Sequence, residues 1–150
     1  MNFNPWIFAP IFFCVALPLL FGLILQLIAW LGGWCTLARS YATTEPMPQP
    51  RLWMQSIELR RWCGYGGCVT MAADAEALYM RPMWPFGFGH PLLRLPWADA
   101  EMKPTTSLLV IKITVFRFAR APGVPISIRR SAAERLVEMA RVARGDTANA

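Results

Sequence analysis

Charge is absent from the first part of the chain. Between Met1 and Ala38 there is no Asp, Glu, Lys or Arg, and every formal charge lies from Arg39 onward. Residues 7–31 form a stretch of 25 residues in which Gln26 is the single strongly polar side chain. About 20 apolar residues are enough to cross a hydrocarbon core of about 30 Å. The sequence therefore predicts a transmembrane anchor, residues 1–38, followed by a charged globular part.

The apolar stretch lacks the marks of a cleaved segment. A cleaved signal peptide requires a basic n-region and a small-residue cleavage site, and residues 2–5 carry no charge. A lipoprotein signal requires small residues before its cysteine, whereas Trp34 precedes Cys35. A buried helix of a globular protein is rarely as long and as free of charge. An uncleaved anchor is the interpretation that remains.

Groups that commonly carry catalysis are also scarce. His90 is the one histidine, and no partner in the sequence marks it as a general base rather than a loop residue that exposes its imidazole or caps a backbone group. Asp99 and Glu101 follow a strand pattern, and we expect them to be solvated. The glycine-rich run at residues 64–67 lacks the lysine and the helix of a phosphate-binding loop. We therefore expect no catalytic residue, no cofactor and no enzyme activity.

Four cysteines leave few options for disulfide or metal chemistry. Cys14 lies in the apolar stretch and Cys35 at its edge, which leaves Cys63 and Cys68 on either side of residues 64–67. Two thiols that flank a tight turn can face each other across a hairpin, as a disulfide or as half of a zinc site. A structural zinc site requires four ligands, so we expect no bound metal. The simpler interpretation is two small apolar strand residues in a reducing compartment.

The composition divides the chain into four parts. Prolines at positions 46, 48 and 50 favour an extended, semi-rigid backbone, so residues 39–50 are interpreted as a Pro-rich spacer between the anchor and the globular domain. Residues 51–145 are expected to form that domain. Residues 146–150 are expected to be a frayed tail.

The globular part changes from a strand pattern to a helix pattern along its length. Alternating apolar residues predict strands within residues 56–62, 68–72, 77–81, 92–97, 107–119 and 124–129, with turns at residues 64–67 and 103–106. Pro125 lacks a backbone N–H, which predicts an edge position for the last strand. Residues 131–143 predict an amphipathic helix that ends at a left-handed Gly145. The expected fold is an N-terminal transmembrane helix plus a small mainly-β domain, a curled antiparallel sheet or partly open barrel of six to seven strands capped by a C-terminal helix.

Two local patterns resemble the pleckstrin-homology-like superfold, including its GRAM-type and bacterial members. The run Gly67-Cys68-Val69-Thr70-Met71, followed by Ala77-Leu78-Tyr79-Met80, resembles the hairpin of such domains. The run at residues 93–100, Leu-Arg-Leu-Pro-Trp-Ala-Asp-Ala, resembles their isoleucine-proline-x-x-aspartate-isoleucine strand end. The layout of one anchor followed by such a domain also resembles that of bacterial single-pass membrane proteins.

The resemblance covers residues 54–142 and implies a binding platform for lipid headgroups, peptides or further copies of itself. Phosphoinositide-binding members carry several basic residues around the first hairpin, whereas this chain has only Arg60 and Arg61 there. The resemblance therefore implies a binding domain without indicating that particular ligand, because a fold alone does not assign a function.

Basic residues predict how the protein is oriented. The N-terminal flank of the anchor has none, whereas Arg39 and Arg51 follow it, which predicts an outer N-terminus and a cytoplasmic domain at the inner (plasma) membrane. The chain has a net charge of +6, and Arg side chains suit phosphate groups. We expect anionic contacts at four arginines, namely Arg60, Arg61, Arg129 and Arg130. The alternative is that the basic residues only set the orientation of the protein in the membrane and keep the domain soluble.

An aromatic loop at residues 83–90 is the most distinctive feature of the domain. Its Trp84, Phe86 and Phe88 cannot all be ordinary loop residues exposed to water. They either fold back to close the barrel or contact the bilayer interface or a protein partner. In the second case they are candidate contact residues for lipid or partner.

These observations predict a membrane-anchored, non-catalytic binding or scaffolding module. Its expected partners are the membrane itself, which it spans once, a protein partner or a second copy, and anionic lipid headgroups; nucleic acid is not expected. The alternative is an accessory subunit of a membrane-protein complex that associates through its transmembrane helix, where Gly22, Gly32 and Gly33 would let another helix approach closely.

Overall fold

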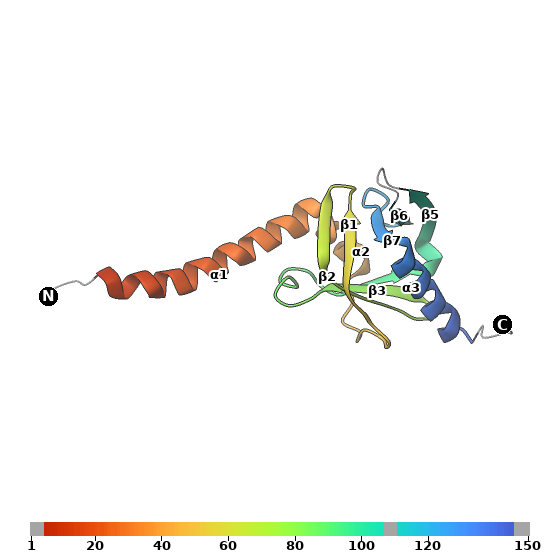
Figure 1. Ribbon diagram of the computed structural model, residues 1–150, viewed down its shortest axis with the longest axis horizontal. Helices are drawn as coiled ribbons and strands as arrows, with labels where there is room; N and C mark the ends of the chain where they lie inside the picture. Colours follow the sequence, from red (N-terminus) through yellow and green to blue (C-terminus); the bar gives the residue numbers. More distant parts are fainter. Residues whose placement is uncertain (1–4, 107–110, 146–150) are drawn as a thin grey trace.

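One helix of the protein is long and apolar enough to cross a membrane. The computed structural model describes residues 5–106 and 111–145, and in these ranges the only candidate span is Phe12–Gly32. It lies within helix α1 (Pro5–Gly32), which carries Pro10 and Pro18 in its interior. Figure 1 shows α1 projecting from one side of the domain as a rod. The expected apolar helix at the N-terminus is confirmed.

Gly33 separates α1 from a second helix that belongs to the domain. Its φ of 97° lies in the left-handed region, which glycine adopts readily because it has no Cβ. The chain turns there into α2 (Trp34–Tyr41). Trp34, Leu37 and Tyr41 fall on one face of this short helix, and all three are buried in the hydrophobic core. The anchor therefore continues directly into the packed domain.

Seven antiparallel strands form one curled sheet, a partly open barrel. The strands are β1 (Leu52–Leu59), β2 (Cys63–Ala73), β3 (Ala77–Pro82), β4 (Leu93–Pro96), β5 (Ala100–Thr106), β6 (Lys112–Phe118) and β7 (Ile126–Arg129). Their order in the sheet is β4-β3-β2-β1-β7-β6-β5, and the 3-10 helix η1 (Trp97–Asp99) joins the two edge strands. The predicted curled sheet is confirmed.

Helix α3 (Arg130–Ala143) covers the core on the side away from α1 (Figure 1). It buries Leu136 and three alanines, Ala132, Ala133 and Ala140. Gly145 follows it with a φ of 79° and donates its N–H to the carbonyl of Val142 at 3.0 Å, so the predicted left-handed residue is confirmed. The order of anchor, sheet and C-terminal helix is compatible with the pleckstrin-homology-like architecture.

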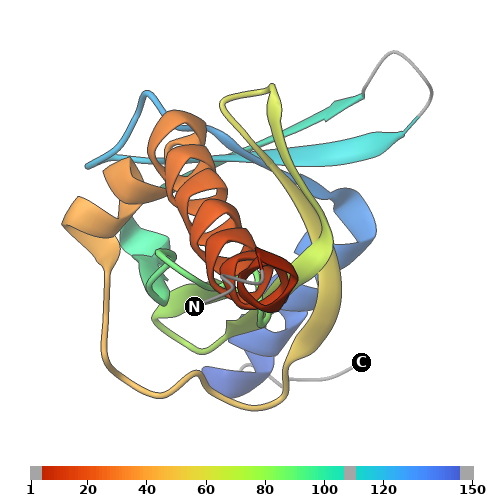
Figure 2. The ribbon, with the colours of Figure 1, turned by 90° about the vertical axis from the view of Figure 1, so that its left-hand side faces the viewer.

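The spacer lies against the outer face of β2 and β3. On the inner face of these strands Met71 and Leu78 belong to the main core, whereas Ala72 and Tyr79 on the outer face pack with Met47 of the spacer. Figure 2 shows the spacer running along the lower edge of the domain from α2 to β1. The spacer is also tied down by an ion pair, because Glu45 Oε2 lies 3.3 Å from Nε of Arg94.

Three predicted turn and edge positions are wrong. Residues 64–67 lie within β2, and the turn before them is made by Arg60 and Arg61 with φ of 52° and 65°. Residues 103–106 belong to β5, an edge strand, where Pro104 is tolerated because edge strands need not donate every ladder bond. Pro125 stands just before β7, which is a central strand between β1 and β6.

The long strand expected at residues 107–119 is present in part. Residues 112–118 form β6, which pairs with β5 and β7, whereas residues 107–110 lie outside the described part of the chain. The helix expected from residue 131 begins one residue earlier, at Arg130. The expected tail, residues 146–150, also lies outside the described residues.

Candidate functional site

The aromatic loop lies against α1 and not over the open end of the barrel. The rings of Phe86 and Phe21 have centroids 6.2 Å apart. A Cβ placed on Gly22 would meet the ring of Phe88 at 3.7 Å. On the same side, Gln26 of α1 faces the backbone of Gly89. Gln26, the one strongly polar side chain of residues 7–31, therefore contacts the domain.

The aromatic side chains of this loop point outward. Trp84 is 91% exposed, Phe88 72% and Phe86 41%. The interpretation that they fold back to close the barrel is wrong, because Trp34 and the inward side chains of the strands already fill the interior. An apolar cleft of about 440 Å³ separates the loop from α1, between Pro85 and residues such as Pro18 and Phe21. Loop and anchor together form one continuous apolar surface.

Backbone hydrogen bonds fix the shape of the loop. Met83 N–H donates to the carbonyl of Cys68 at 2.6 Å, Gly87 N–H to Met83 at 3.0 Å, and His90 N–H to Gly87 at 3.1 Å. Gly87 has little room for a side chain, because an added Cβ would lie 3.0 Å from the Pro82 carbonyl oxygen. The loop is thus a folded unit that presents its aromatic side chains in a defined direction.

His90 anchors the end of the loop inside the domain. The residue is 2% exposed, its Nδ1 lies 2.8 Å from the Phe88 carbonyl oxygen and its Nε2 lies 3.0 Å from the Tyr65 hydroxyl. A carbonyl only accepts hydrogen bonds, so Nδ1 carries the proton and Nε2 accepts from Tyr65. Trp34 Nε1–H, which donates to the Pro91 carbonyl at 3.1 Å, adds a second anchor.

Burial changes the ionisation of this pair. Desolvation lowers the pKa of His90 below its ordinary value, although the bond to the Phe88 carbonyl opposes this change. Desolvation raises the pKa of Tyr65. Both groups are therefore neutral at physiological pH. Of the two roles weighed from the sequence for His90, capping of a backbone group fits this geometry, and exposure of its imidazole does not.

The four arginines expected to contact anions do not lie together. Arg60 donates to the Leu31 carbonyl at 3.1 Å and to Thr36 Oγ1 at 3.4 Å, so it caps the end of α1. Arg61 is exposed at the tip of the same turn. Arg129 ends β7 and Arg130 begins α3, so neither belongs to the turn that meets α1. Only Arg60 and Arg61 are brought to the anchor.

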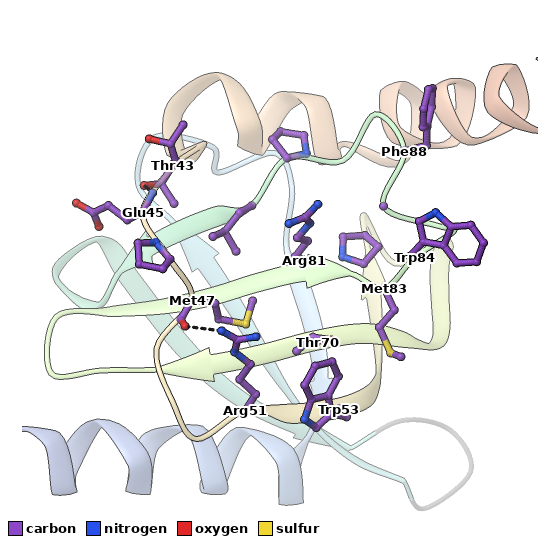
Figure 3. Close-up of a pocket in the computed structure, with 16 residues that line it drawn as sticks. Thr43, Glu45, Met47, Arg51, Trp53, Thr70, Arg81, Met83, Trp84 and Phe88 are labelled. Carbon is purple, nitrogen blue, oxygen red and sulfur yellow. Dashed lines mark hydrogen bonds between the residues drawn. The ribbon is translucent and has the colours of Figure 1, made fainter.

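A groove of about 1050 Å³ lies between the spacer and the aromatic loop. Figure 3 shows it crossing the outer face of β2 and β3, with Arg51 and Arg81 inside it and Trp53, Met83 and Trp84 at one end. Sequence reasoning missed Arg51 and Arg81 as site residues. The available signal was weak: each arginine adjoins a proline at a strand end, and Arg81 alternates with buried residues, which directs it to the outer face.

The cysteines do not form a metal centre or a disulfide. Cys63 and Cys68 lie in one strand, β2, and not across a hairpin, and both are free thiols. Among residues 5–106 and 111–145 no group of three or more His, Cys, Asp or Glu side chains could hold a metal ion. Burial raises the pKa of both thiols, which makes them less reactive as nucleophiles.

Comparison of the chain with protein-family models, with curated proteins and with solved structures finds no match. The aromatic loop, its junction with α1 and the adjacent groove are therefore the features from which a function is argued.

Proposed function

We propose that this protein is a membrane-anchored, non-catalytic module that presents a pleckstrin-homology-like domain to protein partners or anionic lipid headgroups at the cytoplasmic surface of the inner membrane. The observation that carries this proposal is the aromatic loop, which exposes Trp84 and places Phe88 directly beside α1. Aromatic side chains of this kind are enriched at membrane interfaces. A single helix and a loop that contacts the bilayer next to it would hold the domain in one orientation.

The contacts of α1 indicate where the membrane surface lies. Residues 5–25 measure about 31 Å at 1.5 Å per residue, which is enough to cross the hydrocarbon core. Beyond them Ala29 is buried in the domain core and Gly32 lies against Cys63. In this arrangement Gln26 lies at the interface, and the aromatic loop, which meets α1 at Phe21 and Gly22, reaches below it into the edge of the hydrocarbon core. The loop then replaces lipid around the last turns of α1.

The distribution of charge supports the cytoplasmic orientation. No basic residue precedes α1, whereas Arg60 and Arg61 lie at its C-terminal end. Lys and Arg close to the end of a span favour the cytoplasmic side. Near an anionic leaflet each exposed basic residue contributes about 1 kcal/mol to binding. Arg61 is the exposed member of this pair.

Quenching of tryptophan fluorescence tests whether the loop meets the bilayer. The full chain is reconstituted in nanodiscs whose lipids carry bromine on the upper acyl chain, and Trp84→Phe is compared with Trp97→Phe. Trp97 is the matched control, because its Nε1–H donates to the Asp74 carbonyl within the domain at 3.0 Å. We expect Trp84→Phe to remove much more of the quenched fluorescence than Trp97→Phe. Equal losses would show that the loop stays in water and would contradict the proposal.

The second candidate function is that of an accessory subunit held by its helix. The observation that favours it is the apolar cleft between Pro85 and α1, which an apolar side chain of another membrane helix would fill. Replacing Phe21 and Ile24, two exposed residues that line the cleft, by leucine keeps the hydropathy of α1 while changing the shape of the cleft. Loss of a co-purifying membrane protein on this replacement would favour the subunit role, and its retention would favour the domain.

A further inference from the structure

The groove on the outer face of β2 and β3 joins a charged floor to an apolar rim. Thr70 and Arg81 are register partners on this face, and Arg51 enters from the end of the spacer (Figure 3). A Cβ on Gly87 of the aromatic loop would lie 4.0 Å from Nε of Arg81. The same loop that carries Trp84 and Phe88 therefore forms one wall of the groove.

Within the described part of the chain, the guanidinium groups in the groove have no anionic partner. Nε of Arg51 is buried without a hydrogen-bond partner, and its Nη2 donates only to the Met47 carbonyl, at 2.9 Å. Arg81 is exposed and forms no ion pair within residues 5–106 and 111–145. The carboxylate of the lining, Glu45, is already paired with Arg94 at 3.3 Å. An unpaired buried donor of a charged group is costly, so an anion that reached both arginines would gain charge-assisted bonds.

The rim of the groove is apolar where it approaches the anchor. Trp84 is exposed on this part of the rim, and Phe88 lies between the groove and Gly22 of α1. A small soluble anion would leave these aromatic side chains uncovered. A ligand with a phosphate at one end and a hydrocarbon chain at the other satisfies both parts of the groove.

We propose that this groove binds the anionic headgroup of one glycerophospholipid from the membrane in which the protein is anchored. Arg51 and Arg81 bind the phosphate, and the proximal acyl chain lies along Trp84 and Phe88 toward α1. This inference rests on the proposed seating of the domain at the membrane surface, because the lipid enters from the bilayer. It assigns the lipid-binding role to arginines other than the four expected from the sequence.

Lipid retention by the intact chain tests the assignment. The full chain in detergent is mixed with equal amounts of phosphatidylglycerol and phosphatidylcholine, washed, and examined by native mass spectrometry. We expect one phosphatidylglycerol to be retained in preference, and Arg51→Gln with Arg81→Gln to reduce its retention at least about tenfold. The matched control, Arg129→Gln with Arg130→Gln, removes the same charge outside the groove and is expected to change retention less than about twofold. Equal loss in the two double variants would overturn the specific groove.

Two further experiments distinguish lipid binding from unfolding of the variants and from binding of a soluble phosphate. Arg51→Lys with Arg81→Lys keeps the charge, so a loss of lipid with the glutamines but not with the lysines supports anion binding. The melting temperature of the glutamine variant is measured as well, and a value equal to that of the unchanged chain excludes unfolding as the cause of the loss. Glycerol phosphate in millimolar excess is expected not to displace the lipid, and full displacement would overturn the lipid assignment in favour of a soluble phosphate. If Trp84 is still quenched but the substitutions at Arg51 and Arg81 leave lipid retention unchanged, the proposed lipid site in the groove is rejected and the proposed membrane-anchored module is retained. If the quenching is absent as well, both fail.

Discussion

The hydroxyl of Tyr65 donates to Nε2 of His90 across 3.0 Å in the interior of the protein. The two rings are also in edge contact, with centroids 5.5 Å apart. Tyr65 belongs to β2 and His90 ends the aromatic loop, so this bond ties the outward-pointing aromatic side chains to the centre of the sheet. The position of the aromatic loop beside α1 therefore depends on a pair of neutral groups.

Acidification is expected to weaken this attachment. Desolvation lowers the pKa of His90 in the folded protein below 6.5, the ordinary value. The unfolded chain therefore takes up its proton first as the pH falls, and stability is lost below about pH 6.5. We expect the melting temperature of the full chain in detergent to fall between pH 7.5 and pH 5.5.

His90→Asn is the control for this pH dependence. Asparagine keeps a donor for the Phe88 carbonyl but does not titrate, and His90 is the one histidine of the chain. We expect the variant to be less stable at pH 7.5 by about 1 kcal/mol, because the bond to Tyr65 is lost, and its melting temperature to vary less with pH. If the melting temperature of the variant falls with pH as steeply as that of the unchanged protein, His90 is not the group that causes the pH dependence.

Periodicity predicted the architecture well because it reports which side of an element is buried. The strand pattern of residues 77–81 and the helix pattern of residues 131–143 each depend on local alternation of apolar residues, and both elements are present as β3 and α3. The absence of charge before Arg39 predicted α1 for a different reason, because a membrane span needs a long uninterrupted apolar run. None of these inferences requires knowledge of distant contacts.

Tertiary contacts decided the features that the sequence did not predict. The turn before β2 falls at Arg60 and Arg61 and not at the glycines, because Arg60 gains hydrogen bonds to Leu31 and Thr36 that offset its unfavourable φ of 52°. The groove likewise joins Arg51 to Arg81, which are far apart along the chain and show no common motif. Contacts of this kind leave no periodic trace in a sequence.

Replacing Gly33 is expected to disturb the junction between the anchor and the domain. Its φ of 97° is unfavourable for alanine, and an added Cβ would lie 2.9 Å from both Nε of Arg60 and Cγ1 of Val124. We expect Gly33→Ala to destabilise the protein by at least about 2 kcal/mol, as strain and overpacking add. Gly66→Ala is the matched control, since nothing lies within 4 Å of its Cβ position. Equal melting temperatures for the two variants would contradict a tight junction.

The thiols of Cys63 and Cys68 are expected to stay reduced and slow to react. Both are free, and burial raises the pKa of each, so the thiolate fraction near neutral pH is small. We expect iodoacetamide to modify them much more slowly in the folded protein than in guanidinium chloride, as followed by peptide mass spectrometry. If the peptide that carries both cysteines is lighter by two hydrogens in a chain purified without reductant, the free-thiol state is refuted.

Arg60 and Arg61 are neighbours in sequence, yet only one of them is expected to matter for stability. Arg60 donates to the Leu31 carbonyl, one of the last carbonyls of α1 that lack a partner within the helix, and to Thr36 of α2. Arg61 is exposed. Arg60→Ala is therefore expected to lower the free energy of unfolding by about 1–2 kcal/mol, and Arg61→Ala to change it by less than about 0.5 kcal/mol. The measurement is the denaturant or thermal midpoint of the full chain in detergent, at low and at high salt. If Arg60 only bound anions, the two substitutions would change stability equally and with the same dependence on salt. If Arg60 caps α1, only Arg60→Ala is destabilising, because removing its side chain leaves a carbonyl of α1 without its donor.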